Sequence, residues 1–439
     1  MGIHAMSRTG RGLGLGTCRQ STDNRGASLA AAVKLTPPRQ PWGNEEEGHH
    51  TDTSGPTRIG LVYCNDMADN DKSEPEPSND VDSKAMDEFA RRSSTMPQIG
   101  VDLSGYATEE FARSVGEVVN GWLHFFGKIL NLKRLKQVVV SYNYNEALAA
   151  VDQGAPVSGP LKPTNDEIAV GIAMTPTVLR DGEAMSVLVL NAAYMEVLVA
   201  AETPENAALR EQMIYTLAHE CGHVHDLDVR ATSMPDIILK QRLSFRDGIL
   251  FGIASGCWDE YMACHLSAFI ARESALRPLE DTFCTALERA RDRANAAIRQ
   301  YRMHSDVSGV TKEVSEIYKR VMVYAAYMLG HIDGIEGEVA ALVPKAMDAL
   351  DRQPYFKPFF SRLCDELRAM HGTYGQWKGL EIYEPLKQLA DELLKAGGID
   401  IQPRADDGAY VHIPFSAETM PTLEEQMAFL ATKSSGGPK

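Results

Sequence analysis

Three residues within one short stretch have the types and the spacing that metal chemistry requires. They are His219, Glu220 and His223, in the run Thr216-Leu-Ala-His-Glu-Cys-Gly-His-Val224. On a helix, two histidines four residues apart lie one turn above each other, so both imidazoles can reach one metal ion. Glu220 follows the first histidine and can accept a proton from a metal-activated water that attacks a carbonyl group.

The pattern His-Glu-x-x-His is the helical motif of zinc-dependent hydrolases, and the surrounding sequence predicts a buried helix. Thr203-Pro204 is a favourable pair for a helix cap and first turn, and apolar residues follow on nearly every face around the motif. Two histidines and a glutamate are costly to bury without partners, and a metal ion supplies one. We therefore expect a Zn2+ site, the alternative being an accidental match in a core or surface helix.

A catalytic zinc ion usually has three protein ligands and one open position. A third ligand on the same helix would require a glycine and then a histidine or aspartate where Asp226 and Val229 stand. Glu260 is the better candidate, because small residues on its own helical face would let that helix pack closely against the motif helix. These small residues are Ala263, Cys264, Ser267 and Ala271. Asp259 is the second choice, and a plain surface position for Glu260 is the alternative.

The segment Trp258-Asp-Glu-Tyr-Met-Ala263 resembles the glutamate helix of the gluzincins, the HExxH metallopeptidases with a downstream glutamate ligand. A sheet, a motif helix and a glutamate helix between residues 137 and 270 are also similar to the compact ImmA/IrrE-like bacterial peptidases. The resemblance implies a zinc ion held by His219, His223 and Glu260. It also implies Glu220 as the general base in hydrolysis of peptide bonds in a protein or peptide substrate.

The resemblance implies two further roles. Many gluzincins carry an aspartate four residues after the glutamate ligand, where it orients the first histidine. Cys264 stands at that position here, so we expect Asp226 or His265 to provide the hydrogen bond to an imidazole. Gluzincins also use a tyrosine or histidine from a later segment to stabilise the oxyanion. The candidates by residue type are Tyr324, Tyr327 and His331.

Composition narrows the function classes and the compartment. The net charge of -16 argues against nucleic acid as the main partner. No stretch approaches 18 uninterrupted apolar residues, so we expect no membrane span. Seven cysteines without a CxxC pair are typical of a reducing compartment, which predicts a cytoplasmic protein.

Two other functions compete with the peptidase. The first is a regulatory or partner-binding module that retains the fold with little or no cleavage. An intact Glu220 favours the enzyme, because a binding module has no need of a general base. The second is a non-peptidase hydrolase or a structural zinc site. Structural sites favour four closed ligands, often cysteines, and the sequence near the motif has no such set.

The expected fold is α+β and mainly helical, with a small sheet packed on the motif helix and a helical C-terminal part. Residues 1–98, rich in Gly, Ser, Pro and acidic side chains, are expected to be a mostly disordered extension with one possible strand at 58–64. Residues 99–396 would form the zincin-like metallopeptidase domain. Its sheet and motif helix would span 137–228 and its helical part 248–396. Residues 397–439 would be a tail with a possible strand at 409–415 and a helix at 422–432.

Periodicity predicts the individual elements. Strands are expected at 137–142, 168–174 and 185–190, with a turn at 180–183 between the last two. The strand at 185–190 is a candidate edge strand for an extended peptide, and an internal strand is the equally weighted alternative. Further helices are expected at 108–130, 145–152, 256–268, 275–302, 311–333, 336–350, 356–371 and 380–396.

Overall fold

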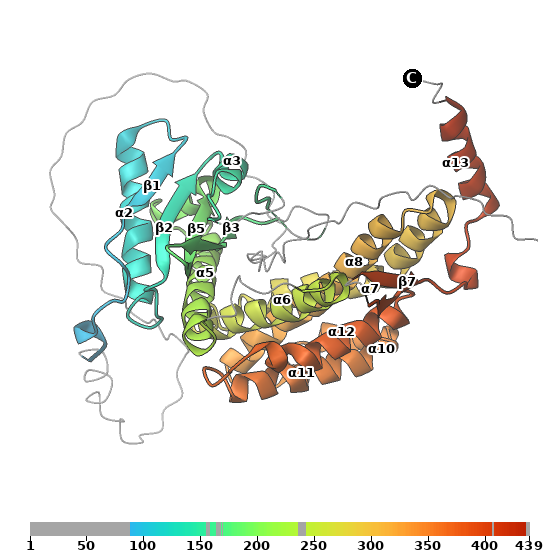
Figure 1. Cartoon of the computed structure of the whole chain (residues 1–439). Coiled ribbons are helices and arrows are strands. Elements are labelled where there is room, and N and C mark those ends of the chain that lie inside the picture. The colour runs from blue at the N-terminus through green and yellow to red at the C-terminus, as the bar shows by residue number, and fades with distance from the viewer. Residues whose placement is uncertain are drawn as a thin grey trace, which may run out of the picture. The chain divides into compact units, whose positions relative to one another are not determined.

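The computed structural model describes residues 88–154, 159–163, 168, 170–235, 243–405 and 408–435 (Figure 1). Within them the protein is α+β and mainly helical, with a small mixed sheet of five strands followed by a long helical region. The expected extension over residues 1–98, including the possible strand at 58–64, lies largely outside the described residues. None of the helices in the described part of the chain combines the length and hydropathy of a membrane span.

The sheet has β5 at its centre. Its strands are β1 (Val101–Ser104), β2 (Leu135–Ser141), β3 (Ala173–Met174), β4 (Thr177–Arg180) and β5 (Glu183–Asn191). β1, β2 and β5 run parallel, and β3 and β4 pair antiparallel with the other side of β5. The prediction that residues 185–190 form an edge strand is therefore wrong, and the internal alternative is confirmed. The apolar run in β5 reflects burial on both faces of the sheet.

The other strand predictions held to different degrees. The turn at 180–183 is confirmed as the β4–β5 hairpin, where Asp181 and Gly182 have φ of 51° and 83°. The strand expected at 168–174 is reduced to the two residues of β3 and an isolated bridge at Val170. Ile168 and Ile172 are buried there, so the apolar pattern reflects burial rather than sheet pairing. β1, an edge strand of four residues, was not predicted.

Helices cover the two faces of the sheet. Alternate side chains of β5 point to opposite faces. Leu188 and Leu190 pack with α2 (Glu109–Phe126) and with the motif helix α5 (Ala207–Ser233), which stand beside the sheet in Figure 1. Val187 and Val189 pack with Tyr144 of α3 (Tyr144–Ala149) on the other face. The short helix α4 (Ala192–Met195) and the 3-10 helix η1 (Glu196–Leu198) follow β5.

The motif helix starts later than the sequence suggests. Residues 204–206 form a turn ahead of it, in which Asn206 Oδ1 accepts from the backbone N–H of Thr203. Asn206 also donates from Nδ2 to the Ala201 carbonyl, and this turn places the first helical residue at Ala207. The buried character predicted for the helix is confirmed, since residues 215–224 are all buried.

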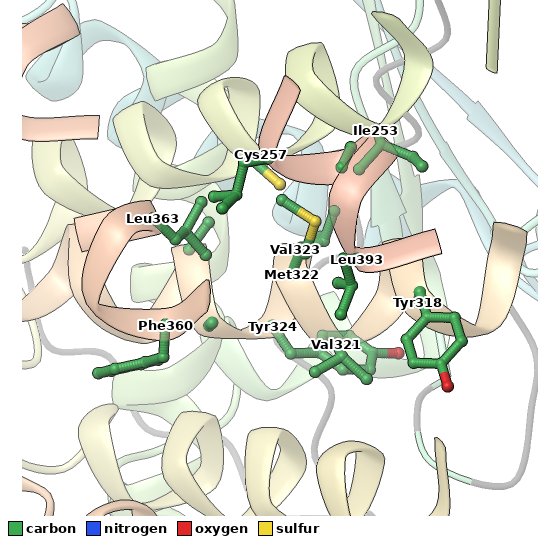
Figure 2. Packing of buried hydrophobic residues seen from close by; sticks show 14 of the residues in the cluster. Ile253, Cys257, Tyr318, Val321, Met322, Val323, Tyr324, Phe360, Leu363 and Leu393 are labelled. Atoms are coloured by element: carbon green, nitrogen blue, oxygen red, sulfur yellow. The ribbon is translucent and has the colours of Figure 1, made fainter. Parts of the chain in front are cut away.

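The helical region packs around one large apolar core, part of which Figure 2 shows. Its helices are α6 (Phe245–Ser267), α7 (Leu276–His304), α8 (Val307–Gly334), α9 (Val339–Leu342), α10 (Pro344–Arg352), α11 (Lys357–Gly372), η2 (Leu380–Tyr383) and α12 (Glu384–Ala396). The expected helix at 336–350 is split at Val343, because Pro344 disfavours a helical conformation in the residue before it. Cys257 of α6, Met322 of α8, Leu363 of α11 and Leu393 of α12 meet in this core.

The C-terminal part ends in small elements. A two-stranded hairpin joins β6 (Asp400–Pro403) and β7 (Ala409–His412), so the strand expected at 409–415 is shorter and has a partner that was not predicted. A 3-10 helix, η3 (Ala417–Thr419), and the helix α13 (Leu423–Ser435) follow. The helix expected at 422–432 is thereby confirmed.

Candidate metal centre

Two helices bring three ligand-type side chains together in the interior. His219 and His223 lie one turn apart on α5, and Glu260 reaches them from α6. Glu260 Oε2 lies 3.2 Å from His219 Nε2 and 3.4 Å from His223 Nε2, and the two Nε2 atoms are 3.2 Å apart. All three side chains are buried. They form a group that could hold a metal ion.

The separations between the ligand atoms fit a small tetrahedral ion. Ligands about 2.0–2.1 Å from zinc in a tetrahedral arrangement lie about 3.3 Å from one another. The three observed separations fall between 3.2 and 3.4 Å. Two imidazole nitrogens and one carboxylate oxygen are also the donor set of an open zinc site. The residues present therefore fit the ion that the sequence pattern predicts.

The charges around the group determine the protonation state of two of its members. Burial opposes ionisation of Glu260, but His223 and His219 outweigh burial and hold its pKa well below the usual value. Burial alone would lower the pKa of His223, whereas the carboxylates of Glu260, Glu220 and Asp259 raise it above the usual value. The carboxylate of Glu260 is therefore ionised, as a metal ligand must be, and a metal ion would have to displace the proton of His223.

A hydroxyl group fixes the carboxylate of Glu220. Thr175, directly after β3, donates from Oγ1 to Glu220 Oε2 over 2.6 Å. Both side chains are buried. Cys221, the next residue of the motif, packs in the core with the sheet rather than with the histidines, as expected. Nothing in the sequence Met174-Thr-Pro176 distinguishes Thr175 from an ordinary strand end, so sequence reasoning missed it.

Tyr327 of α8 contacts two members of the ligand group. Its ring stacks on His219, with the centroids 5.5 Å apart and the planes 6° from parallel. Its hydroxyl is hydrogen-bonded to Glu260. Tyr324 lies beside it, with ring centroids 6.4 Å apart, and belongs to the helical core. Tyr327 therefore contacts the ligand group through both its ring and its hydroxyl, and its oxyanion role stays a prediction.

His331, the third oxyanion candidate, has partners at both ring nitrogens. Nε2 lies 2.8 Å from the carbonyl oxygen of Arg272, and Nδ1 lies 3.3 Å from the hydroxyl of Tyr215. Burial is the main cause that lowers the pKa of His331. The ring is therefore neutral, and both of its nitrogens are hydrogen-bonded to other groups of the protein.

Asp226 and Asp259 belong to a buried charged network, not to the ligand group. Arg230 Nε lies 2.7 Å from Asp226 Oδ2, and its Nη1 lies 3.0 Å from Asp259 Oδ1. Trp258 donates from Nε1 to Asp226 Oδ1 over 3.2 Å. This network joins the end of α5 to α6. Asp259, the second choice as a ligand, is thus paired with Arg230 while Glu260 faces the histidines.

The contact expected at a histidine from Asp226 or His265 is made by Cys264. Its Sγ lies 3.6 Å from His219 Nδ1. The ring of His265 lies 4.4 Å from that of His371 and stacks on Tyr261 instead. Residues four apart on α6 share a face with Glu260, whereas the next residue is turned away by about 100°. The position of Cys264, four residues after Glu260, could therefore have predicted this contact. A cysteine is an unusual residue type for that role, so the sequence analysis did not propose it.

The chain was compared with family models, curated proteins and solved structures, and none of them matches it. The site described above therefore rests on the geometry of this chain alone.

Proposed function

We propose that this protein is a zinc-dependent metallopeptidase that hydrolyses peptide bonds of a protein or peptide substrate. The observation that carries the proposal is the buried group of His219, His223 and Glu260, whose three ligand atoms have the mutual separations of a zinc site. Glu220 lies between the two histidines in the sequence and is held beside them by Thr175. A zinc site with an adjacent, ordered carboxylate has both parts that hydrolysis requires.

The chemistry follows from these parts. When bound, zinc lowers the pKa of water and polarises the scissile carbonyl. The carboxylate of Glu220 takes one proton from the attacking water while the water oxygen bonds to the carbonyl carbon. Glu220 then delivers that proton to the amine nitrogen as the C–N bond breaks. Thr175 fixes the orientation of this carboxylate, because its hydroxyl donates to Glu220 Oε2 over 2.6 Å.

The sheet offers an edge where a substrate backbone can pair. In the described part of the chain, β3 and β4 end the strand order on one side, and they flank Thr175. We expect an extended peptide to add to this edge by backbone hydrogen bonds, beside Glu220. This edge replaces the one that the sequence suggested at 185–190, which β5 cannot provide because strands occupy both of its sides.

The first test is zinc content, measured by elemental analysis of the wild type, His223→Ala and Glu260→Ala. We expect about one equivalent in the wild type and a loss in both variants, because each removes one of three ligands. Glu220→Gln should keep its zinc but lose peptide cleavage, since the amide cannot act as a base. Wild-type protein without zinc after supplementation would contradict the proposal. If the protein binds zinc but cleaves no peptide in a library, the alternative function, a partner-binding module, would be favoured.

A further inference from the structure

A continuous row of buried polar groups leads away from the first motif histidine. Cys264 Sγ lies 3.6 Å from His219 Nδ1 and 3.5 Å from the hydroxyl of Tyr215. That hydroxyl lies 3.3 Å from His331 Nδ1, and His331 Nε2 lies 2.8 Å from the carbonyl oxygen of Arg272. His219, Cys264, Tyr215 and His331 are each at most 2% exposed. The row thus connects α5, α6 and α8 on the side of His219 that faces away from Glu260.

The carbonyl at the far end sets which nitrogen of His331 donates. A carbonyl oxygen only accepts, so the neutral ring of His331 must donate its proton from Nε2 to Arg272. His331 Nδ1 then accepts from the hydroxyl of Tyr215. The same hydroxyl also lies 3.5 Å from Cys264 Sγ and donates to it. The sulfur of Cys264 has a second lone pair, with which it can accept from His219 Nδ1–H, 3.6 Å away.

This direction matters because His219 can carry its proton on either ring nitrogen. With the proton on Nε2, the ring would donate to Glu260 Oε2, 3.2 Å away, and would have no lone pair for a metal. With the proton on Nδ1, Nε2 is free to bind a metal. Partners on the outer nitrogen are the usual means by which proteins fix this choice.

We propose that Cys264 is the positioning residue that holds His219 in its metal-binding tautomer, and that Tyr215 and His331 orient the thiol of Cys264. The role rests on the proposed function, because it concerns a ligand of the same zinc site. Sulfur is a weaker acceptor than the carboxylates common at this place. The row behind Cys264 compensates by holding the sulfur in place, because the hydroxyl of Tyr215 donates to it.

The test measures zinc affinity by chelator competition in Cys264→Ala, Cys264→Ser and Tyr215→Phe. Removing such a partner typically weakens metal affinity about 10- to 100-fold, which is the loss expected for Cys264→Ala. Cys264→Ser should recover much of this loss, because a hydroxyl oxygen has two lone pairs and can accept from both partners of the sulfur. Tyr215→Phe should give a smaller loss. In the cobalt-substituted protein, the exchangeable ring N–H resonance of His219 should shift and exchange faster with water in Cys264→Ala.

Cys257→Ala is the matched control. Cys257 is also fully buried on α6, but it packs in the helical core. Its removal should cost similar stability and leave zinc affinity and the histidine resonance unchanged. Equal affinities in Cys264→Ala and wild type, or equal losses in both cysteine variants, would overturn the positioning role. A wild type without metal would overturn this role and the proposed function together. Metal binding that depends on Cys264 without peptide cleavage would overturn the peptidase only.

Discussion

Gly222 of α5 and Ala263 of α6 touch where the two helices cross. A Cβ atom added to Gly222 would lie 2.9 Å from Ala263 Cα and 3.1 Å from its carbonyl oxygen, closer than real contacts allow. Gly222 precedes the ligand His223, and Ala263 lies one turn after the ligand Glu260. The short reach of the Glu260 carboxylate therefore depends on a close approach of two backbones that only a missing side chain permits.

Gly222→Ala should separate the two helices and weaken the metal centre. Overpacking of this kind costs about 1–3 kcal/mol of folding free energy. Zinc affinity should fall as well, since the distance from Glu260 to the histidines increases. Gly252→Ala on α6 is the control, because a Cβ there has no atom within 4 Å, and it should stabilise the helix by about 0.5–1 kcal/mol. Chemical denaturation and chelator competition measure both effects, and wild-type zinc affinity in Gly222→Ala would contradict the packing argument.

Thr175→Val should slow peptide hydrolysis while the zinc content stays the same. The substitution keeps the shape of the side chain but removes the hydroxyl that donates to Glu220. Hydrogen bonds to charged groups contribute about 1.5–3 kcal/mol, so kcat should fall about 10-fold or more. Thr175→Ser retains the hydroxyl and should stay close to wild type. If kcat is unchanged in Thr175→Val, Glu220 does not need this hydrogen bond to act as a base.

Asp259→Asn separates the role of Asp259 from that of Glu260. The substitution leaves Arg230 with one buried carboxylate partner instead of two. Breaking a buried ion pair costs about 3–5 kcal/mol, so the unfolding midpoint in urea should drop while zinc remains bound. Asp281→Asn, which breaks an exposed pair with Lys345, should leave the unfolding midpoint nearly unchanged, because solvent screens this pair. Loss of zinc from folded Asp259→Asn would make Asp259 a ligand after all.

His265 makes stability depend on pH. Burial is the main cause that lowers its pKa, His371 lowers it further, and Asp333 opposes both. Asp333 is itself bonded to Tyr261 and Arg368. Because the folded pKa lies below the unfolded value of about 6.5, the unfolded state binds more protons in between. The contribution of His265 is therefore present above about pH 6.5 and lost as the pH falls through the folded pKa.

His265→Gln should accordingly reduce the loss of stability between about pH 7.5 and pH 5.5, a range that spans the unfolded pKa. Urea unfolding at the two pH values measures it. His412→Gln is the control, since His412 is exposed, and its difference between the two pH values should equal that of wild type. An unchanged difference in His265→Gln would exclude His265 as the source.

The elements that local spacing specifies could be predicted from the sequence. The helical spacing of His219 and His223 places them on one face of α5 wherever that helix lies, and the Asp181-Gly182 turn forms its hairpin through backbone preferences alone. The alternating and continuous apolar runs likewise predicted β2, β5 and the long helices. The exact start of α5 was not predictable in this way, because it depends on the turn that the side chain of Asn206 stabilises through Thr203 and Ala201.

The contacts between elements were decided by the tertiary structure. Asp259 and Glu260 are adjacent in sequence and chemically alike, but they point about 100° apart on α6, and only the register of α6 against α5 determines which one meets the histidines. The same register brings Cys264 to His219, and the edge position of β3 brings Thr175 to Glu220. These partners are distant in sequence, so no local pattern encodes them. The contacts between α5 and α6 follow from how closely the two helix backbones pack at Gly222 and Ala263.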